Sequence, residues 1–410
     1  MSKKYLGPRI ALIFTCFTLS LFTCVLSAFI MQAVAYFHVS ATSAGGLETY
    51  QNATVAILSF ISFSFLLKVG YRRSLMIVLL VMIFIGIVTP IVNEFWMMKL
   101  FLVFVGLALV SIKVAVYSTV TLITENKKQH AIFITVIEAT CMISSMLGMW
   151  ILSEFIKFNL EHWMYALWFF SVLAIINFIV WCFVKLDESV LMKEKAESVS
   201  QQIKEIWTLL KYKVVWYAII LFFLASLVET CFAVWLPGFY QESMAVKASL
   251  ILQIGSMFVF ALAAGRIFVA FLLKYLSWNK VLFIFYLVGC ILLITILITI
   301  HKPEHAVTGI WSIPFIALLL PLMGFFLAPS TPLINSSILT STPEPKHALM
   351  MTIMTITFAI SGSLAARLLG FLFDEFGGVT GLKIATVVPL VIMVLMVIPY
   401  ARALRKSNIQ

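Results

Sequence analysis

The sequence predicts an all-α membrane protein with twelve transmembrane helices in two six-helix halves. Hydrophobic residues make up 63% of the 410 residues and charged residues only 11%, whereas a soluble domain is about 25% charged. The apolar residues gather in twelve runs, each about as long as the roughly 20 residues that span a bilayer as a helix. One long polar stretch separates the first six runs from the last six.

Each predicted helix is an apolar run bounded by charged, polar or turn-forming residues. In the first half the runs cover residues 10–36, 49–67, 74–92, 99–123, 131–156 and 163–184. In the second half they cover 214–236, 248–273, 279–300, 308–335, 349–372 and 379–401. The run 308–335 contains Pro329 and Pro332, which free backbone carbonyls and predict a bend.

The polar stretch between the halves is rich in Lys, Glu, Ser and Gln and predicts a surface helix with a linker. The expected domains are therefore an N-terminal half at 1–184, a cytoplasmic linker at 185–213 and a C-terminal half at 214–410.

The basic residues predict the orientation of the helices, because cytoplasmic loops carry an excess of Lys and Arg. With the N-terminus inside, 20 of the 28 basic residues lie in cytoplasmic loops and ends, and five lie outside. The net charge of +11 is then a topology signal and does not indicate nucleic-acid binding. We expect both termini to be cytoplasmic, and the short loops suggest a bacterial cytoplasmic (inner) membrane.

Sequence motifs for catalysis are missing from the chain. It has no nucleophile elbow, no phosphate-binding loop and no His or Cys set with metal-ligand spacing. We therefore expect neither an enzyme nor a protein with a cofactor or metal, and direct ATP-driven transport is disfavoured. Secondary transport is the function class that these exclusions leave.

Lys113 and Glu138 lie inside predicted helices, where a charge costs roughly 2.5–3.5 kcal/mol on insertion scales. Lys113 is about two residues past the centre of its segment, within roughly 3 Å of the midplane at a rise of 1.5 Å per residue. It is a candidate for binding a carboxylate or phosphate, and Tyr117 shares its helix face. The alternative is a structural ion pair with Glu138, which is otherwise a candidate proton site.

Further candidates are intramembrane charged or polar residues. Glu229 is expected to couple or gate protons, or else to make a packing hydrogen bond. Arg367 is a candidate second anion contact. Asn335, Gln253 and Ser27 are weaker candidates for the binding cavity, because small polar residues in membranes also mediate helix packing.

Two loops at equivalent places in the halves carry a motif, as a parallel repeat requires. The loop after the second segment contains Gly70, Arg72 and Arg73, and the region after the eighth contains Gly265 and Arg266. The first loop resembles the Gly-x-x-x-Asp-x-x-Gly-Arg-Arg signature of the major facilitator superfamily, although Leu67 stands where the Asp belongs. The resemblance implies that these five residues form a conformational latch, which here should be weakened or rely on helix-end dipoles alone.

The stretch from Val228 to Tyr240 and the motif that begins at Gly265-Arg266 resemble the fucose:galactose:glucose:proton symporter family, with Glu229 at the family's acidic position. In segment 4 the sugar symporters carry a Glu near the place where this chain has Lys113. That reversal of charge favours an anionic solute over a sugar.

We therefore expect a secondary active transporter that moves a small organic solute, anionic in character, by alternating access. Protons are the expected coupling ion, handled by Glu138 or Glu229. The expected partners are the solute, protons and the lipid bilayer, and the expected state is a monomer. The alternatives are an exporter of a siderophore, carboxylate-rich metabolite or drug, and a non-transporting membrane sensor.

Overall fold

The structure is a computed structural model that describes residues 6–59, 69–124, 127–158, 160–186, 199–244, 246–300, 313–343 and 346–406. Within these residues, eleven helices are long and apolar enough to cross a membrane. The predicted all-α membrane class is thereby confirmed. For the remaining predicted helix, 49–67, the structure describes α4 over Leu47–Ser59, and residues 60–67 lie outside the described ranges.

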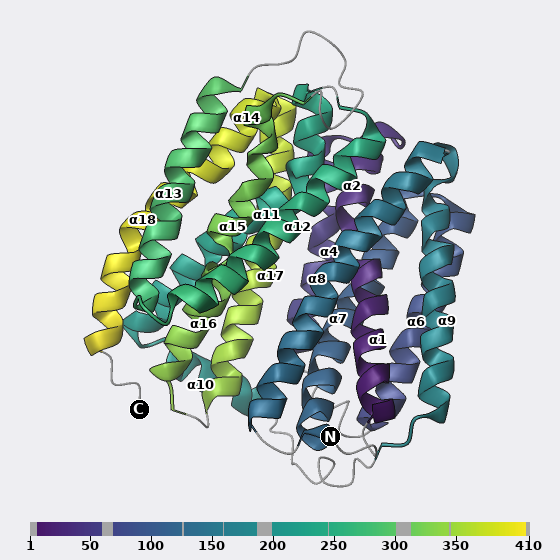
Figure 1. The fold of residues 1–410 in the computed structure, drawn as a ribbon, viewed down its shortest axis with the longest axis horizontal. Helices are drawn as coiled ribbons and strands as arrows, with labels where there is room; N and C mark the ends of the chain where they lie inside the picture. Colours follow the sequence, from purple (N-terminus) through teal and green to yellow (C-terminus); the bar gives the residue numbers. More distant parts are fainter. Residues whose placement is uncertain are drawn as a thin grey trace. The chain divides into compact units, whose positions relative to one another are not determined.

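The helices of the first half are α1 (Leu6–Thr23), α2 (Val25–Ala35), α3 (Ala41–Gly45), α4 (Leu47–Ser59), α6 (Tyr71–Val92), α7 (Phe95–Ile123), α8 (Lys127–Phe158), the 3-10 helix η2 (Leu160–Tyr165) and α9 (Ala166–Phe183). Those that follow are α10 (Val199–Leu209), α11 (Lys213–Met244), α12 (Ala248–Leu272), α13 (Trp278–Thr299), α14 (Phe315–Leu318), the 3-10 helix η5 (Leu320–Leu322), α15 (Met323–Leu327), α16 (Ser330–Thr340), α17 (His347–Phe376) and α18 (Gly378–Lys406) (Figure 1).

By packing, the chain divides into two compact units. The first comprises Met1–Leu26 and Tyr50–Ser198, and the second comprises Ser27–Thr49 and Val199–Gln410. In the first unit α6 packs against both α7 and α9, while α1 packs against α7, α8 and α9. These units differ from the linear halves in one segment, 27–49.

A buried hydrogen-bond network joins α1 and α9 in the first unit. The Thr15 hydroxyl donates to the Ala11 carbonyl oxygen at 2.8 Å and accepts from the Trp181 indole at 2.7 Å. The Asn177 amide donates to Thr15 and to Thr18, both at 3.1 Å. Because buried polar groups are costly unless they are paired, this network fixes how the two helices face each other.

The first transmembrane segment consists of two helices, although the sequence predicts one continuous run. α1 ends at Thr23 and α2 begins at Val25, with Cys24 between them. The division between the two packing units follows directly, after Leu26. The segment therefore contributes its first part to one unit and its second part to the other.

In the second unit α11 packs against α12, α16, α17 and α18. The short helix α3 packs on α17 at backbone-to-backbone distance. A Cβ on Gly370 would overlap the Ala41 carbonyl oxygen, and a Cβ on Gly45 would overlap the Ala366 carbonyl oxygen. Glycine at both positions is what allows the contact.

The predicted bend in the tenth segment is present. The span Phe315–Thr340 is divided into α14, η5, α15 and α16, and the last break falls at Ala328 and Pro329. Proline has no amide hydrogen and clashes with the preceding helical turn, so each proline-containing position weakens the continuous helix. The break starts a new helix at Ser330, inside the transmembrane span.

Large apolar side chains on the outside of the helices match a bilayer environment. Phe84 is 66% exposed, Ile267 74% and Leu395 67%. Exposed apolar side chains of this size would be unfavourable in water and are favourable against hydrocarbon.

Candidate functional site

Five polar side chains from four helices gather inside the second unit, and we call them the Glu229 cluster. They are Glu229 on α11, Arg266 on α12, Tyr286 on α13, and Ser330 and Thr331 on α16. The Thr331 hydroxyl donates to the Glu229 carboxylate at 3.5 Å. Arg266 and Tyr286 lie within electrostatic range of Glu229, and Tyr286 lies beside Ser330.

The break at Pro329 explains why α16 contributes two hydroxyls to this cluster. Ser330 and Thr331 lie in the first turn of a helix that begins within the membrane-spanning segment. The N-terminal end of a helix carries a partial positive charge, so it favours a carboxylate nearby. The local sequence Pro-Ser-Thr-Pro thus places donors and a favourable dipole near Glu229.

Glu229 and Arg266 are close but do not form a direct ion pair. Among the described residues the only ion pair with atoms within 4.0 Å joins Lys157 to Glu154, at 3.5 Å on an exposed helix face. Within the same residues, the Arg266 Nε atom is buried without a hydrogen-bond partner. The cluster therefore holds an acid and a base that are incompletely satisfied, and it can accept a proton or a small polar ligand.

Asn335 extends this cluster along α16. It lies four residues after Thr331 and so on the same helix face. Its side chain is partly buried, and its Oδ1 atom is buried with no hydrogen-bond partner among the described residues. The predicted cavity residue thus lies about one helical turn beyond Thr331, the residue that donates to Glu229.

The other predicted solute contacts of the second unit lie on α2, α12 and α17. Ser27 is buried on α2, and Gln253 is partly buried on α12. Arg367 is exposed on α17. Their roles in binding stay predictions.

In the first unit, Lys113 and Tyr117 belong to α7, but their side chains lie outside the described part of the structure. Glu138 is partly buried on α8. It lies within electrostatic range of Cys16 on α1, whose thiol is hydrogen-bonded to Cys141. The expected pairing of Lys113 with Glu138 therefore stays a prediction.

The predicted latch residues of the first loop lie at the start of α6. Gly70 precedes the helix with a φ of 91°, which favours glycine. Arg72 donates to the Trp181 carbonyl oxygen at 3.0 and 3.3 Å and to the Cys182 carbonyl oxygen at 3.1 Å. These carbonyls end α9, so Arg72 makes the helix-end interaction that favours a cation. Arg73 is exposed, and Leu67 lies outside the described residues.

In the second half, the surroundings of Gly265 and Arg266 differ from those of Gly70 and Arg72. A Cβ on Gly265 would lie 2.6 Å from the Ala328 Cβ atom, so glycine lets α12 approach α15 closely. The neighbouring Arg266 belongs to the Glu229 cluster. The two equivalent motifs therefore place their arginines in different environments. Arg72 lies at a helix end, and Arg266 lies beside an acid.

Glu48, a buried acid at the start of α4, was not among the site residues predicted from the sequence. Its side chain is 5% exposed and lies within electrostatic range of Cys231 on α11. In the same unit Gln32 is 1% exposed, and both polar atoms of its amide have no hydrogen-bond partner among the described residues. The sequence contained one signal for Glu48. It lies three and four residues before Gln51 and Asn52, a spacing that makes residues neighbours on a helix surface.

Asp374 was also missed, and it holds α3 to α17. Its carboxylate accepts from the Ala41 amide at 3.0 Å, the Thr42 amide at 2.9 Å and the Thr42 hydroxyl at 2.6 Å. It therefore caps the N-terminus of α3 from a helix more than 300 residues away. Local sequence carries no signal for such a long-range cap.

This chain resembles one known protein family and several solved structures. The family model of the Major Facilitator Superfamily matches residues 10–366 of the chain. No curated protein matches the sequence. Among solved structures, the nucleoside transporter NupG has a TM-score of 0.74 at 13% identity, with 99% of this chain and 100% of that chain covered.

Two sugar transporters have similar folds. The D-xylose-proton symporter has a TM-score of 0.71 at 12% identity, covering 95% of this chain and 97% of its own. The E. coli fucose:proton symporter FucP has a TM-score of 0.63 at 13% identity, covering 99% of this chain and 100% of its own. At these identities the likeness concerns the fold.

Proposed function

Because the chain belongs to the major facilitator superfamily, whose members are membrane transporters, we propose that it moves a small organic solute by alternating access and couples this movement to protons. The observation that carries the proposal is the Glu229 cluster, an acid and an arginine near each other inside a membrane-spanning bundle. As predicted from the sequence, we place both termini in the cytoplasm and the protein in a bacterial inner membrane.

The neighbours of Glu229 support a role for this residue in proton coupling. An apolar environment favours the neutral form of a carboxylic acid, whereas a nearby guanidinium and hydroxyl donors favour the ionised form. Glu229 has both kinds of neighbour, and Arg266 is not in direct contact. A shift of α12 relative to α11 during the transport cycle would therefore change the proton affinity of Glu229.

Glu229 is a better candidate than Glu138 for this role. Its cluster contains a cation and three hydroxyl-bearing residues that the structure describes. The side chain of Lys113, the expected partner of Glu138, lies outside the described part of the structure. We assign coupling to Glu229.

An anionic solute is the proposed cargo class. The sequence places Lys113 near the membrane midplane, where a cation is costly unless it has a partner. Arg266 adds a second intramembrane cation whose Nε atom has no hydrogen-bond partner among the described residues. A carboxylate or phosphate group would satisfy such donors with charge-assisted hydrogen bonds.

A thermal-shift screen tests the cargo class. Purified protein is heated with organic acids, organic phosphates, nucleosides and sugars, since a ligand that binds the native state raises the melting temperature. We expect stabilisation by an acid or phosphate in the wild type and its loss in Lys113→Ala. Stabilisation by sugars or nucleosides alone would refute an anionic cargo. Lys99→Ala, on the same helix but near its start, is the control.

A further inference from the structure

A surface cavity of about 430 Å³ lies between α13 and α18 in the second unit. α13 contributes Asn279, Lys280, Phe283 and Ile284, and α18 contributes Val397, Ile398, Ala401, Arg402 and Arg405. The two helices pack together, with the start of α13 beside the end of α18 (Figure 1). We call this cavity the α13–α18 groove.

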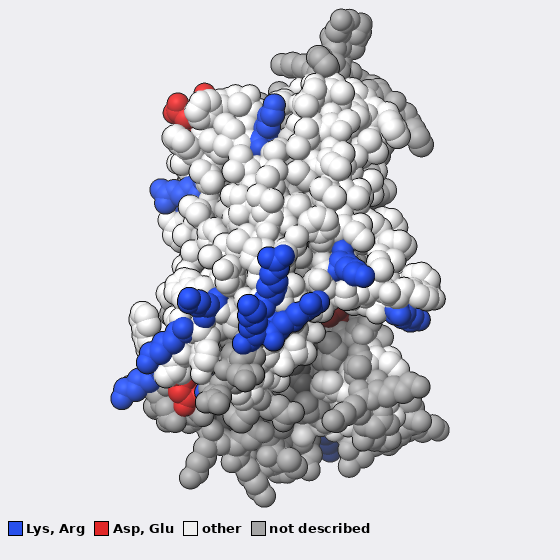
Figure 2. Space-filling view, turned by 90° about the vertical axis from the view of Figure 1, so that its left-hand side faces the viewer, with Lys and Arg blue, Asp and Glu red and all other residues white. Residues whose placement is uncertain are grey.

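Three cations border the groove, and they are not neutralised. Lys280, Arg402 and Arg405 form no ion pair within the described residues. On the face that bears this groove, Lys and Arg side chains gather in a band with few acidic side chains among them (Figure 2). Positive charges that border one groove repel each other, so an anion placed among them would be bound favourably.

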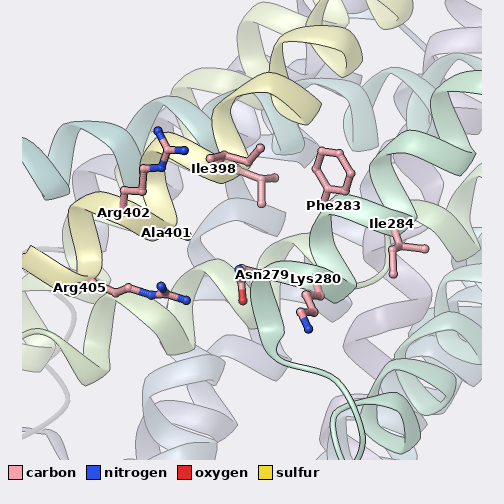
Figure 3. A pocket seen from close by; sticks show the side chains of 9 residues that line it. Asn279, Lys280, Phe283, Ile284, Ile398, Ala401, Arg402 and Arg405 are labelled. Carbon is pink, nitrogen blue, oxygen red and sulfur yellow. The ribbon is translucent and has the colours of Figure 1, made fainter.

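Apolar side chains from both helices also line the groove. Phe283 and Ile398 face each other across it, while the Arg405 side chain extends from α18 toward Asn279 on α13 (Figure 3). Phe283 and Ile284 follow Lys280 by three and four residues, so they lie roughly 5 Å further along the helix axis. The cations thus lie at the helix ends and the apolar residues lie deeper in the membrane span.

The groove is held in shape by contacts between the two helices. The Trp278 and Tyr400 rings pack edge to face with centroids 5.6 Å apart. The Tyr400 hydroxyl is in turn hydrogen-bonded to Ser337 on α16, at 2.7 Å. A binding site that is formed before its ligand arrives loses less conformational entropy on binding.

We propose that the α13–α18 groove binds an anionic phospholipid. Its headgroup phosphate lies among Lys280, Arg402 and Arg405, and an acyl chain lies against Phe283, Ile284 and Ile398. Basic pockets at the ends of transmembrane helices suit anionic headgroups, because the charge lies at headgroup depth and the apolar side chains continue into hydrocarbon. A soluble phosphate would use only the cations and would leave the apolar side chains uncovered. The site is independent of the transported solute.

Native mass spectrometry and thermal unfolding in detergent test the proposal. We expect phosphatidylglycerol to remain bound to the wild type and to raise its melting temperature more than phosphatidylcholine does. The double variant Arg402→Gln/Arg405→Gln should bind phosphatidylglycerol about 30-fold more weakly, because each of the two basic residues near the headgroups contributes an effect of roughly five- to sixfold. Phe283→Ala should weaken binding as well, through the acyl chain.

Matched controls separate the site from general charge. Lys383→Gln/Lys406→Gln removes two exposed cations of the same helix that do not line the groove, and it should bind phosphatidylglycerol like the wild type. Arg402→Lys/Arg405→Lys keeps the charge and should retain most of the binding. Equal binding in the Gln variants and the wild type would overturn the proposal. Stabilisation by inorganic phosphate equal to that by phosphatidylglycerol would also overturn it, because the site would then recognise only the anion.

Discussion

At the scale of residues, two groups of buried polar side chains differ in how completely they are paired. In the first unit, Thr15, Thr18, Asn177 and Trp181 all find hydrogen-bond partners in one another or in the backbone. In the second unit, the described polar groups of the Glu229 cluster are incompletely paired. A fully paired network stabilises one arrangement, whereas unpaired groups leave room for a ligand or proton. We therefore interpret the first set as structural and the second as functional.

Thr15→Val tests the structural interpretation. The valine has nearly the same shape but cannot accept from Trp181 or Asn177, so two buried donors lose their shared acceptor. We expect the free energy of unfolding to fall by about 1–3 kcal/mol, measured by denaturant or thermal unfolding in detergent. Thr140→Val is the control, because Thr140 is less buried and bonds only to its own helix at 2.8 Å. Equal effects of the two substitutions would contradict the interpretation.

Glu229→Gln tests the functional interpretation. Glutamine keeps the size and polarity of the side chain but cannot take up or release a proton. We expect proton-driven accumulation to be lost, while exchange of labelled for unlabelled solute continues, since exchange needs no net change of protonation. Proteoliposomes loaded with the solute identified by the thermal-shift screen provide both measurements. Glu375→Gln, exposed on α17, is the control and should behave like the wild type.

At the scale of elements, the five-residue helix α3 is stable only through its contacts with α17. A helix this short does not form alone in water, and here Asp374 caps it while Gly370 and Gly45 permit close packing. In the predicted topology α3 lies outside, between the first and second transmembrane segments.

Asp374→Ala removes the cap of α3. Three hydrogen bonds to a carboxylate are lost, and we expect the backbone amides of residues 41–46 to exchange hydrogen about tenfold faster. Hydrogen–deuterium exchange with peptide resolution measures this directly. Glu375→Ala changes the adjacent acid, which is not bonded to α3 in any described contact, and should leave the exchange rate unaltered. An unaltered rate in Asp374→Ala would show that the glycine contacts alone hold α3.

The sequence predicted most membrane-spanning elements, because length and apolar composition determine them. The predicted helix 279–300 is observed as Trp278–Thr299, and Pro329 and Pro332 indicated the break before α16. The interruption at Cys24 was not predicted, since no proline or glycine marks it. Glu48 lies just before the predicted segment 49–67 and was not considered as a site residue, and the Asp374 cap joins residues too distant in sequence for any spacing rule.

At the scale of the whole molecule, alternating access requires two bodies that move relative to each other. In our proposal the two packing units serve as these bodies, and the segment 27–49 packs with the second although it lies in the sequence of the first half. Sequence composition predicts the family's layout but not this assignment, which depends on tertiary contacts. The intramembrane charges Glu229 and Arg266 were visible in the sequence, whereas their proximity was not.

The measurement that tests the account most directly is solute-dependent proton movement in proteoliposomes. A pH-sensitive dye inside the vesicles reports protons while an anionic solute is added outside. We predict that wild-type protein carries protons with the solute, that Glu229→Gln abolishes the proton signal, and that Glu138→Gln preserves it. A wild-type proton signal in Glu229→Gln, with solute transport intact, would contradict the assignment of coupling to Glu229.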